Sequence, residues 1–413
     1  MNSLIEKYNN WTKNPQNGED LFFYGFVLFI FRGIMGTTMF PYIGIIFKIS
    51  FGIAILLLIA KIILFDRYTF KMLIAVTGMF ICGAAVFLSS GYFSPFLWVL
   101  LIVAAKDVPF NKILKVYLLM NITIMGLAFV ASLLGIIENL AYVNEEWDSY
   151  RYSFGCVYTT DFAAHIFFML LAAFYLCQKR LRWYHYAGTC AIAGFIYYFC
   201  FAKLDTICIL LIVLFFGVYH VLQWQSRRES VVVPGMEKDS QQVFVFKRVK
   251  AYLKWKGLWM KSALFSMPVL AMLMYFLSDY YEKDNEFLET INKTITGRLA
   301  FGKTGLDDYG ISLFGQDIPM VGFGGSTILK EEYFFIDSSY INILLRYGII
   351  FLLMIFIIYG TICYKHKGDT ALMMAIVLLA VSCFIDHHIM EEAYNPLTYA
   401  LFAKTGDVMW RSS

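Results

Sequence analysis

Long apolar stretches recur along almost the whole chain, and they restrict the fold more than any other feature of the sequence. A helix needs about 20 apolar residues to cross a lipid bilayer. Stretches of this kind lie at 21–38, 41–65, 69–89, 92–106, 113–137, 157–177, 183–201, 203–222, 259–278, 338–363, 370–386 and 389–404. We therefore predict an all-α polytopic membrane protein with about 12 transmembrane helices. The stretches at 92–106 and 389–404 are short, so the expected range is about 10 to 12, and the first of them, with Pro95, also fits a re-entrant segment.

The composition supports the same class of protein. The chain is 60% hydrophobic and 15% charged, whereas a soluble domain carries about 25% charged residues. The formal net charge of +4 is small and gives no indication of a nucleic-acid partner. The first 20 residues are polar, so we expect no cleaved signal peptide. Residues 1–413 are expected to form a single transmembrane domain in a lipid bilayer.

Lysines and arginines in the connecting loops predict the orientation, because cytoplasmic loops are enriched in them. If the N-terminus is cytoplasmic, the basic loop at 223–258 is cytoplasmic too, and part of it has the pattern of an interfacial helix. The segment at 279–337 then lies outside. From Ser278 to Asp337 there are 11 Asp and Glu against five Lys and Arg. We expect both termini in the cytoplasm and one large extracytoplasmic loop at 279–337, whose first half has the spacing of an amphipathic helix.

Ionisable residues gather near the predicted outer ends of the spans. Such residues are costly at membrane depth and are candidates for function. They are Arg151, Asp161, His165, Lys203, Asp205, Arg298, Asp337, Arg346, Asp386, His387, His388, Glu391 and Glu392. Because they come from distant parts of the sequence, their presence on one side predicts a site there.

Three of these cations are candidates for binding an anion. Arg298 is the only arginine between Asp279 and Asp337, and a guanidinium offers a planar fork that suits phosphate oxygens. Arg151 and Lys203 are the other two. The alternative is that they form salt bridges with the carboxylates of the loop, which contribute little when they are exposed.

The adjacent His387 and His388 are candidates for proton transfer. On a helix they would point about 100° apart, so only one of them would face a given pocket. An imidazole can accept a proton from a hydroxyl near neutral pH; the alternative is a hydrogen-bonded interfacial histidine. There is no HxxxH or CxxC pattern, so we expect no metal and no disulfide framework. Asp161 and His165, four residues apart, are expected to hydrogen-bond within the bundle.

The stretch GQDIPMVGFGGS contains Gly322 and Gly324 and predicts a loop that turns tightly or approaches a ligand closely. Its backbone N–H groups could form an anion-binding nest, and a plain flexible loop is the alternative. There is no GxxxxGK[ST] motif, which argues against an ATP-driven pump.

The order of these motifs resembles the Wzy-type polysaccharide repeat-unit polymerases, which are similar to O-antigen polymerases and ligases. The resemblance rests on the following positions: Gly297, Arg298, Pro319, Gly322 and Gly324 in the loop; Asp337, Ser339, Tyr340, Arg346, Tyr347 and Gly348 in the next span; Arg151 and Gly155 earlier. Lys203 stands where the family often has Ser-Arg.

The resemblance implies a fold like that of the GT-C-like glycosyltransferase class, in the bacterial cytoplasmic membrane. It implies a metal-independent glycosyltransferase without a cofactor that joins oligosaccharide repeat units carried on undecaprenyl pyrophosphate, for capsule, exopolysaccharide or O-antigen. A flippase and a chain-length regulator would be its partners.

The same resemblance implies roles for individual residues. Arg298, with Arg151 and Lys203, would neutralise the departing pyrophosphate. His387, His388 or a carboxylate such as Asp337 or Glu391 would accept the proton of the attacking hydroxyl. Substrate binding would involve Arg151, Lys203, Arg346, Gly322, Gly324, Tyr340 and Glu391.

Two other functions remain open on the sequence. A ligase that moves finished glycan to another acceptor would use the same donor chemistry. A flippase or transporter of lipid-linked sugars is the second alternative, although transporters commonly show two related halves, and no internal repeat is visible in this sequence.

Overall fold

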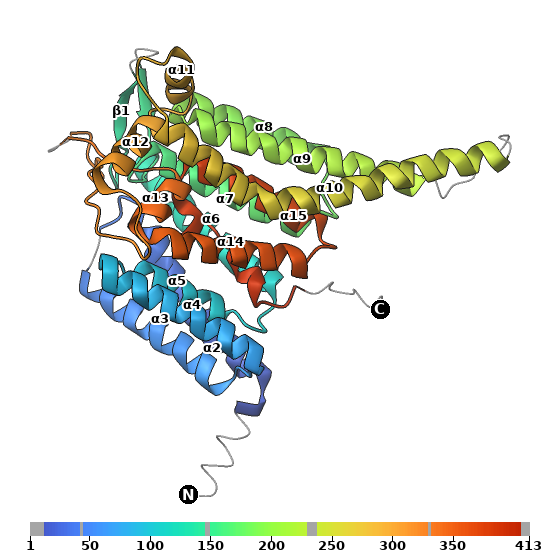
Figure 1. Cartoon of the computed structure of the whole chain (residues 1–413), viewed down its shortest axis with the longest axis horizontal. Coiled ribbons are helices and arrows are strands. Elements are labelled where there is room, and N and C mark those ends of the chain that lie inside the picture. Colours follow the sequence, from blue (N-terminus) through green and yellow to red (C-terminus); the bar gives the residue numbers. More distant parts are fainter. Residues whose placement is uncertain (1–11, 42–43, 145–148, 229–237, 329–331, 406–413) are drawn as a thin grey trace, which may run out of the picture.

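The computed structural model describes residues 12–41, 44–144, 149–228, 238–328 and 332–405 (Figure 1). The fold is mainly helical, with one small hairpin. The longer helices are α2 (Pro15–Gly36), α3 (Gly44–Leu64), α4 (Phe70–Ser90), α5 (Ser94–Ala104), α6 (Phe110–Leu133), α7 (Thr159–Cys177), α8 (Trp183–Phe195), α9 (Lys203–Arg228), α10 (Lys238–Asp279), α14 (Gly348–Lys365) and α15 (Thr370–Ile385).

Seven helices in the described part are long and apolar enough to cross a membrane: α3, α4, α6, α7, α9, α10 and α14. Two shorter helices, α5 and α15, are also apolar. Large apolar side chains stand exposed along the outer helices, such as Ile63 on α3 and Leu88 on α4. Exposed apolar surface of this extent fits a lipid environment. The predicted fold class, an all-α multi-pass membrane protein, is therefore confirmed.

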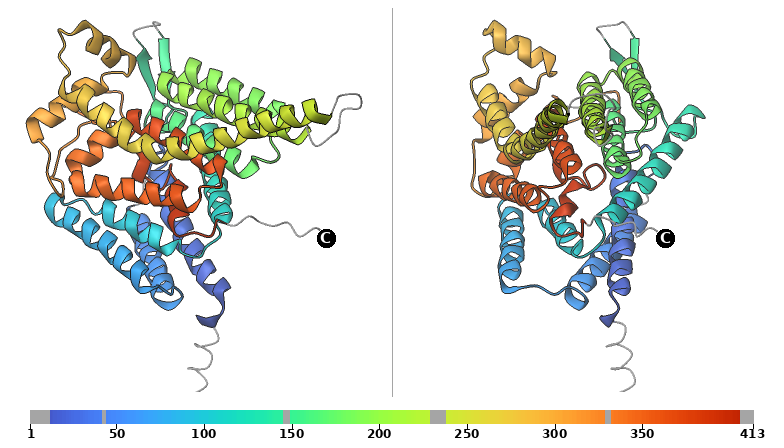
Figure 2. Two further views of the ribbon diagram at one scale, coloured as in Figure 1. Left: turned by 45° about the vertical axis from the view of Figure 1, so that its right-hand side comes forward. Right: turned by 90° about the vertical axis from the view of Figure 1, so that its right-hand side faces the viewer.

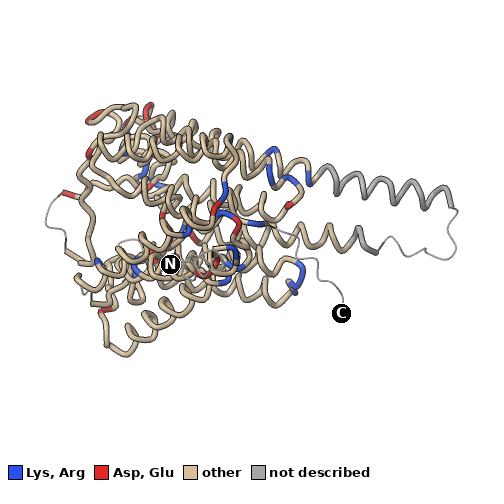
Figure 3. Tube along the Cα trace, turned by 90° about the horizontal axis from the view of Figure 1, so that it is seen from below, with Lys and Arg blue, Asp and Glu red and all other residues tan. Residues whose placement is uncertain are grey.

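The helices form layers that are recognisable in all views. Helices α2 to α5 lie along one side of the molecule, and α8, α9 and α10 lie along the other (Figure 2). Helices α14 and α15 lie between them, and α10 packs along α15. The ends of α9 and α10 project beyond the bundle. Many of the described lysines and arginines lie toward that end, whereas acidic residues are frequent at the opposite end (Figure 3).

The predicted span at 338–363 is broken into two helices, α13 (Ser339–Arg346) and α14. The break is at Gly348, whose φ of 85° is left-handed and favours glycine. A neighbouring loop bonds the backbone groups at the break: Gln316 N–H donates to the Arg346 carbonyl at 3.2 Å, and Ile349 N–H donates to Ser312 at 3.1 Å. The span is therefore helical but kinked, for a local backbone reason.

The predicted twelfth span, 389–404, is wrong as a helix. The chain there forms only two short 3₁₀ turns, His388–Met390 and Leu397–Leu401. Protein groups bond its backbone instead: the Tyr117 hydroxyl donates to the Tyr394 carbonyl at 2.6 Å, and the Asn395 side chain donates to the Ile389 carbonyl at 2.7 Å. Irregular backbone is tolerated in a protein interior when other groups bond it in this way.

The segment after α10 supplies part of the site. Its first half forms α11 (Glu286–Thr294), with Leu288 buried, so the amphipathic helix prediction is confirmed. Helix α12 (Arg298–Tyr309) follows, after Gly297 with φ 83°. The Asn292 side-chain oxygen accepts hydrogen bonds from the N–H groups of Leu299 and Ala300, both at 3.1 Å. These bonds fix the start of α12 and hence the position of Arg298.

A second element near the site is the hairpin of β1 (Ala141–Asn144) and β2 (Ser149–Tyr152). The strands are antiparallel, with Arg151 opposite Tyr142. In Figure 1 the hairpin lies at the same end of the molecule as α11 and α12. Segments that are far apart in the sequence therefore meet at one end of the bundle.

Candidate functional site

A cavity of about 440 Å³ lies where these segments meet. Six residues predicted for the site line it together: Arg151, Arg298, Asp337, His387, His388 and Glu391. Further polar lining comes from Thr37, Tyr158, Thr159, Thr160, Asp161, Thr296, Asp386 and Tyr394, and aromatic lining comes from Tyr142, Phe323, Tyr333 and Phe335. The cavity thus has a polar floor and an aromatic wall, with cations from two unrelated segments.

Arg298 is held rigidly and is 8% exposed. Its Nε donates to the Ile385 carbonyl, and its Nη1 donates to the Ile295 carbonyl at 3.0 Å and to the Thr296 hydroxyl. Its Nη2 faces two carboxylates, Asp337 at 3.6 Å and Asp386 at 3.8 Å. These two separations are loose for charge-assisted hydrogen bonds. The Nη2 edge of the guanidinium can therefore take an anion from the cavity without losing its other bonds.

Asp386 follows α15 directly, and two bonds from α13 fix its backbone. Its carbonyl accepts the N–H of Ser339 at 3.1 Å and the hydroxyl of Ser339. The Asp386 side chain is buried, and its Oδ2 has no hydrogen-bond partner within the described part of the chain. A buried carboxylate oxygen without a partner is costly, so Asp386 depends on the charge of Arg298.

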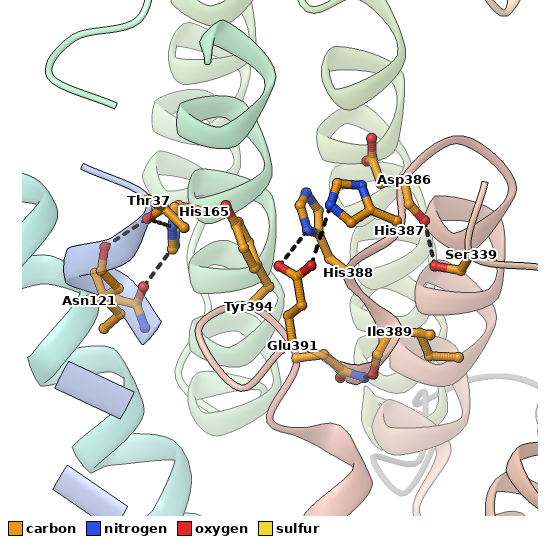
Figure 4. Close-up of polar contacts among 12 residues, drawn as sticks. Thr37, Asn121, His165, Ser339, Asp386, His387, His388, Ile389, Glu391 and Tyr394 are labelled. Atoms are coloured by element: carbon orange, nitrogen blue, oxygen red, sulfur yellow. Dashed lines mark hydrogen bonds and ion pairs between the residues drawn. The ribbon is translucent and has the colours of Figure 1, made fainter. Parts of the chain in front are cut away.

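His387, His388 and Glu391 form a compact cluster (Figure 4). Glu391 Oε2 lies 3.0 Å from His388 Nδ1, and Glu391 Oε1 lies 3.3 Å from His387 Nε2. The cluster lies after α15, outside the spanning helices. Adjacent histidines both reach one carboxylate because the chain leaves the helix here, which the sequence did not indicate.

The charges of this cluster can be assigned from its geometry. Burial alone would lower the pKa of His388, but the Glu391 carboxylate, with Asp386 and Asp161, outweighs burial and raises it to about 9. Burial would raise the pKa of Glu391, but the two imidazoles outweigh burial and lower it to about 2. Near neutral pH, His388 is therefore a cation paired with an ionised Glu391.

His387 behaves differently from its neighbour. Burial lowers its pKa below the ordinary value, and the adjacent His388 cation adds to this against the attraction of Glu391. His387 is therefore neutral near pH 7 and can accept a proton. With one nitrogen on Glu391, it has the arrangement of a carboxylate-oriented general base.

Tyr394 lies in the middle of a stack of three rings. Its ring stacks on His388 with centroids 3.8 Å apart and on His165 with centroids 4.0 Å apart. His165 is itself bonded on both sides, to Asn121 Oδ1 and to the Thr37 hydroxyl, each at 2.9 Å. The predicted hydrogen bonding of His165 within the bundle is present, although its partners are Asn121 and Thr37 and not Asp161.

Arg151 reaches the cavity from β2. Its guanidinium lies 5.8 Å from the centre of the Tyr142 ring, and its Nε has no hydrogen-bond partner in the described residues. Burial lowers its pKa from the ordinary value, but an arginine remains charged at neutral pH. A second cation with spare donors therefore lies beside the aromatic wall.

Gly322 and Gly324 do not line the cavity themselves but let their loop approach Tyr158, which does. The Gly324 N–H donates to the Tyr158 hydroxyl at 2.6 Å. A Cβ at Gly322 would lie 2.7 Å from that hydroxyl, so glycine is needed for this close approach. The Phe323 ring, between the two glycines, lies against Tyr142 with centroids 5.5 Å apart.

Three further predicted residues do not line the cavity. The Arg346 guanidinium stacks over Tyr92 at 4.0 Å. The Tyr340 hydroxyl donates to the Ala380 carbonyl at 2.7 Å, inside the bundle. Lys203 lies 4.5 Å from the centre of the Phe201 ring. The geometry gives Arg346 and Tyr340 packing roles.

Sequence reasoning also missed residues that the cavity contains. Tyr142, Tyr158 and Tyr394 carry no local motif, and the chain has 28 tyrosines. Asp161 and Asp386 were among the ionisable residues whose clustering predicted the site, but neither was given a role in it. Their charge at the ends of apolar stretches was the signal that could have identified them.

His387, His388 and Glu391 are the residues that could hold a metal, since one ligand atom from each lies within 4.8 Å of the others. The same atoms already contact one another within the cluster. Among the described residues the group has three members only. We interpret it as an ion-paired acid–base cluster.

Comparisons with protein-family models, with curated proteins and with solved structures gave no match. The functional argument therefore rests on the residues of the cavity.

Proposed function

We propose that this chain is a Wzy-type polymerase, which joins oligosaccharide repeat units carried on undecaprenyl pyrophosphate at the outer face of the bacterial cytoplasmic membrane. The observation that supports the proposal most is the meeting of Arg298 and Arg151 with the His387–Glu391 pair in one cavity. Cations for a diphosphate and a base for a hydroxyl are the two groups that such a transfer needs.

In this proposal the donor binds with its pyrophosphate at the Nη2 edge of Arg298. Arg151 adds positive charge from the hairpin side, and His388, held protonated by Glu391, adds more from the floor. The sugars lie along the aromatic wall of Tyr142, Phe323 and Tyr333, since rings pack on the apolar faces of sugars.

The reaction is a substitution at the anomeric carbon of the donor sugar. A hydroxyl oxygen of the acceptor forms the new C–O bond while the bond to the pyrophosphate oxygen breaks. Undecaprenyl pyrophosphate leaves with the electron pair, and its growing charge is stabilised by Arg298 and Arg151. His387 takes the hydroxyl proton, and Glu391 stabilises the imidazolium that results. No cofactor or metal is part of this scheme.

The proposed topology has an even number of crossings, about ten, with both termini and the basic end of α9 and α10 in the cytoplasm. The distribution of charge supports it, because lysines and arginines lie toward the end from which these helices project. The cavity then faces outward, where a flippase would deliver the repeat unit and a chain-length regulator would act.

A strain that lacks this chain tests the function directly. The proposal predicts that single repeat units still reach the surface, that no polymer ladder forms, and that the intact chain restores the ladder. Loss of all surface repeat units would indicate a flippase instead. Long polymer that stays on its lipid carrier would indicate a ligase.

A further inference from the structure

One part of the cavity carries polar groups that the proposed reaction does not use. The row of side chains in Figure 4 runs from Thr37 and His165 through Tyr394 to His388, His387 and Asp386. Asp386 pairs with Arg298, so the anion-binding part of the cavity lies at that end of the row. The opposite end, beyond Tyr394, belongs to the start of α7 and the end of α2.

The Tyr394 hydroxyl is the first unused group. Tyr394 is 0% exposed and lines the cavity, and its hydroxyl has no hydrogen-bond partner among the described residues. Its ring cannot swing to find one, because it is stacked between His388 and His165. His165 is also held in place by Asn121. The Asn121 amide nitrogen donates to the Tyr117 carbonyl at 3.2 Å, and the amide oxygen therefore faces His165. A buried hydroxyl held without a partner points to a ligand.

Asp161 is the second unused group. Four carboxylates line the cavity, and three of them face basic side chains: Asp337 and Asp386 face Arg298, and Glu391 faces the two histidines. Asp161 has no ion pair within the described part of the chain. It lies close to the Tyr394 hydroxyl without meeting hydrogen-bond geometry.

We propose that Asp161 and Tyr394 form the subsite for the acceptor sugar, where each binds a hydroxyl group of the acceptor. A carboxylate accepts a hydrogen bond from a sugar hydroxyl, and the Tyr394 hydroxyl donates one or accepts one, so the pair matches the hydrogen-bonding capacity of a neutral sugar. Thr159 and Thr160, at the start of α7, also line the cavity. This inference rests on the proposed function: it places the acceptor on one side of the His387–Glu391 pair and the donor pyrophosphate on the other.

The test uses the purified full-length protein, a lipid-linked repeat unit as donor and a soluble repeat-unit oligosaccharide as acceptor. Tyr394→Phe keeps both ring stacks and removes only the hydroxyl, so the acceptor KM is expected to rise about 3- to 10-fold. Asp161→Asn removes a charged acceptor, with an expected rise of about 10- to 100-fold.

The matched control is Tyr340→Phe, which removes a buried tyrosine hydroxyl that bonds the Ala380 carbonyl, and neither residue lines the cavity. It should leave the acceptor KM unchanged. An unchanged acceptor KM in both Tyr394→Phe and Asp161→Asn overturns the subsite, and so does a fall in kcat alone.

Equilibrium binding of the soluble oligosaccharide separates this inference from the proposed function. If the wild-type protein binds the oligosaccharide and both variants bind it more weakly, the subsite is supported even if no transfer occurs. If the wild-type protein transfers sugar but its two variants bind the oligosaccharide normally, the subsite is wrong and the proposed function stands.

Discussion

At the scale of single residues, Arg298 is the most important residue of the proposed site, because its side chain is buried and its Nη2 edge is incompletely paired. Its Nε and Nη1 atoms donate three hydrogen bonds to two backbone carbonyls and one hydroxyl. Its Nη2 edge faces Asp337 and Asp386. A buried charge must be compensated. Arg298 therefore has a structural duty toward Asp386 as well as the proposed role toward the donor, and any test must separate the two.

A double substitution makes this separation. Arg298→Ala leaves Asp386 buried without its cation and is expected to cost about 3–5 kcal/mol of stability along with activity. Arg298→Ala combined with Asp386→Asn removes the orphaned charge, so thermal stability should largely recover while polymer formation stays absent. Thermal unfolding in detergent and the polymer ladder measure the two effects. Recovery of the ladder in the double variant would contradict the proposed role of Arg298.

The acid–base cluster predicts a bell-shaped pH dependence of the transfer rate. Activity needs neutral His387, so it should rise with pH through a pKa below the ordinary 6.5. It also needs protonated His388, so it should fall above about pH 9. Rates of the purified enzyme across pH test this.

The variant Glu391→Gln sharpens the pH test. The Glu391 charge raises the pKa of both histidines, so its loss should move both limbs of the profile to lower pH. A profile that Glu391→Gln leaves unmoved would show that these histidines do not set the rate.

The sequence predicted the charged part of the site better than its aromatic part. Arg298, His388 and Glu391 stood out because charges are expensive within apolar surroundings. Tyr394 and Tyr142 did not, since aromatic residues make up 18% of this chain and are ordinary packing in a membrane protein. Arg346 was predicted for the site for the same reason as Arg298, but its guanidinium stacks on Tyr92. The sequence could not distinguish the two arginines, because spacing along the chain does not show which partner a cation contacts.

At the scale of elements, the chain after α15 is the part where apolar composition no longer predicts a helix. The apolar stretches predicted most helix ends up to α15 within a few residues, but α10 begins at Lys238, well before the predicted start at 259. The segment 389–404 is also rich in apolar residues, but the side chains of Asn395 and Tyr117 bond its backbone in place of helical bonds. Pro396 also removes a backbone donor. The exit from the helix is what brings His387 and His388 onto one carboxylate.

The junction of α13 and α14 gives a stability prediction. Gly315 has a φ of 86°, and a Cβ there would lie 2.1 Å from the Arg346 carbonyl oxygen. Gly315→Ala should therefore destabilise the protein by about 2–5 kcal/mol, through left-handed strain and overpacking.

The control for this prediction is Gly78→Ala, in the interior of α4 with open space around the added methyl group. Alanine is the better helix former, so this variant should be neutral or slightly stabilised. Thermal unfolding of both variants in detergent is the measurement. Equal stability of the two would show that the contact between the loop and Arg346 is not formed.

At the scale of the whole molecule, the orientation can be tested with single cysteines. Cys177 and Cys190 are the exposed cysteines of the described residues, so replacing both by serine gives a low background. Asp284→Cys lies before α11 at the cavity end, and Lys367→Cys lies between α14 and α15. In intact cells a membrane-impermeant thiol reagent should label the first and not the second. The reverse pattern would put the cavity in the cytoplasm, where this chemistry could not meet flipped repeat units.

The central claim is that one cavity transfers sugar from a lipid pyrophosphate to a sugar hydroxyl. The most direct measurement incubates the purified protein in liposomes with a single lipid-linked repeat unit and separates the products by mass. The expected products are lipid-linked oligomers of two or more repeats, with one undecaprenyl pyrophosphate released for each new linkage, and no oligomers with Arg298→Ala/Asp386→Asn. Unchanged substrate with the folded wild-type protein, or elongation at the wild-type rate in the double variant, would contradict it.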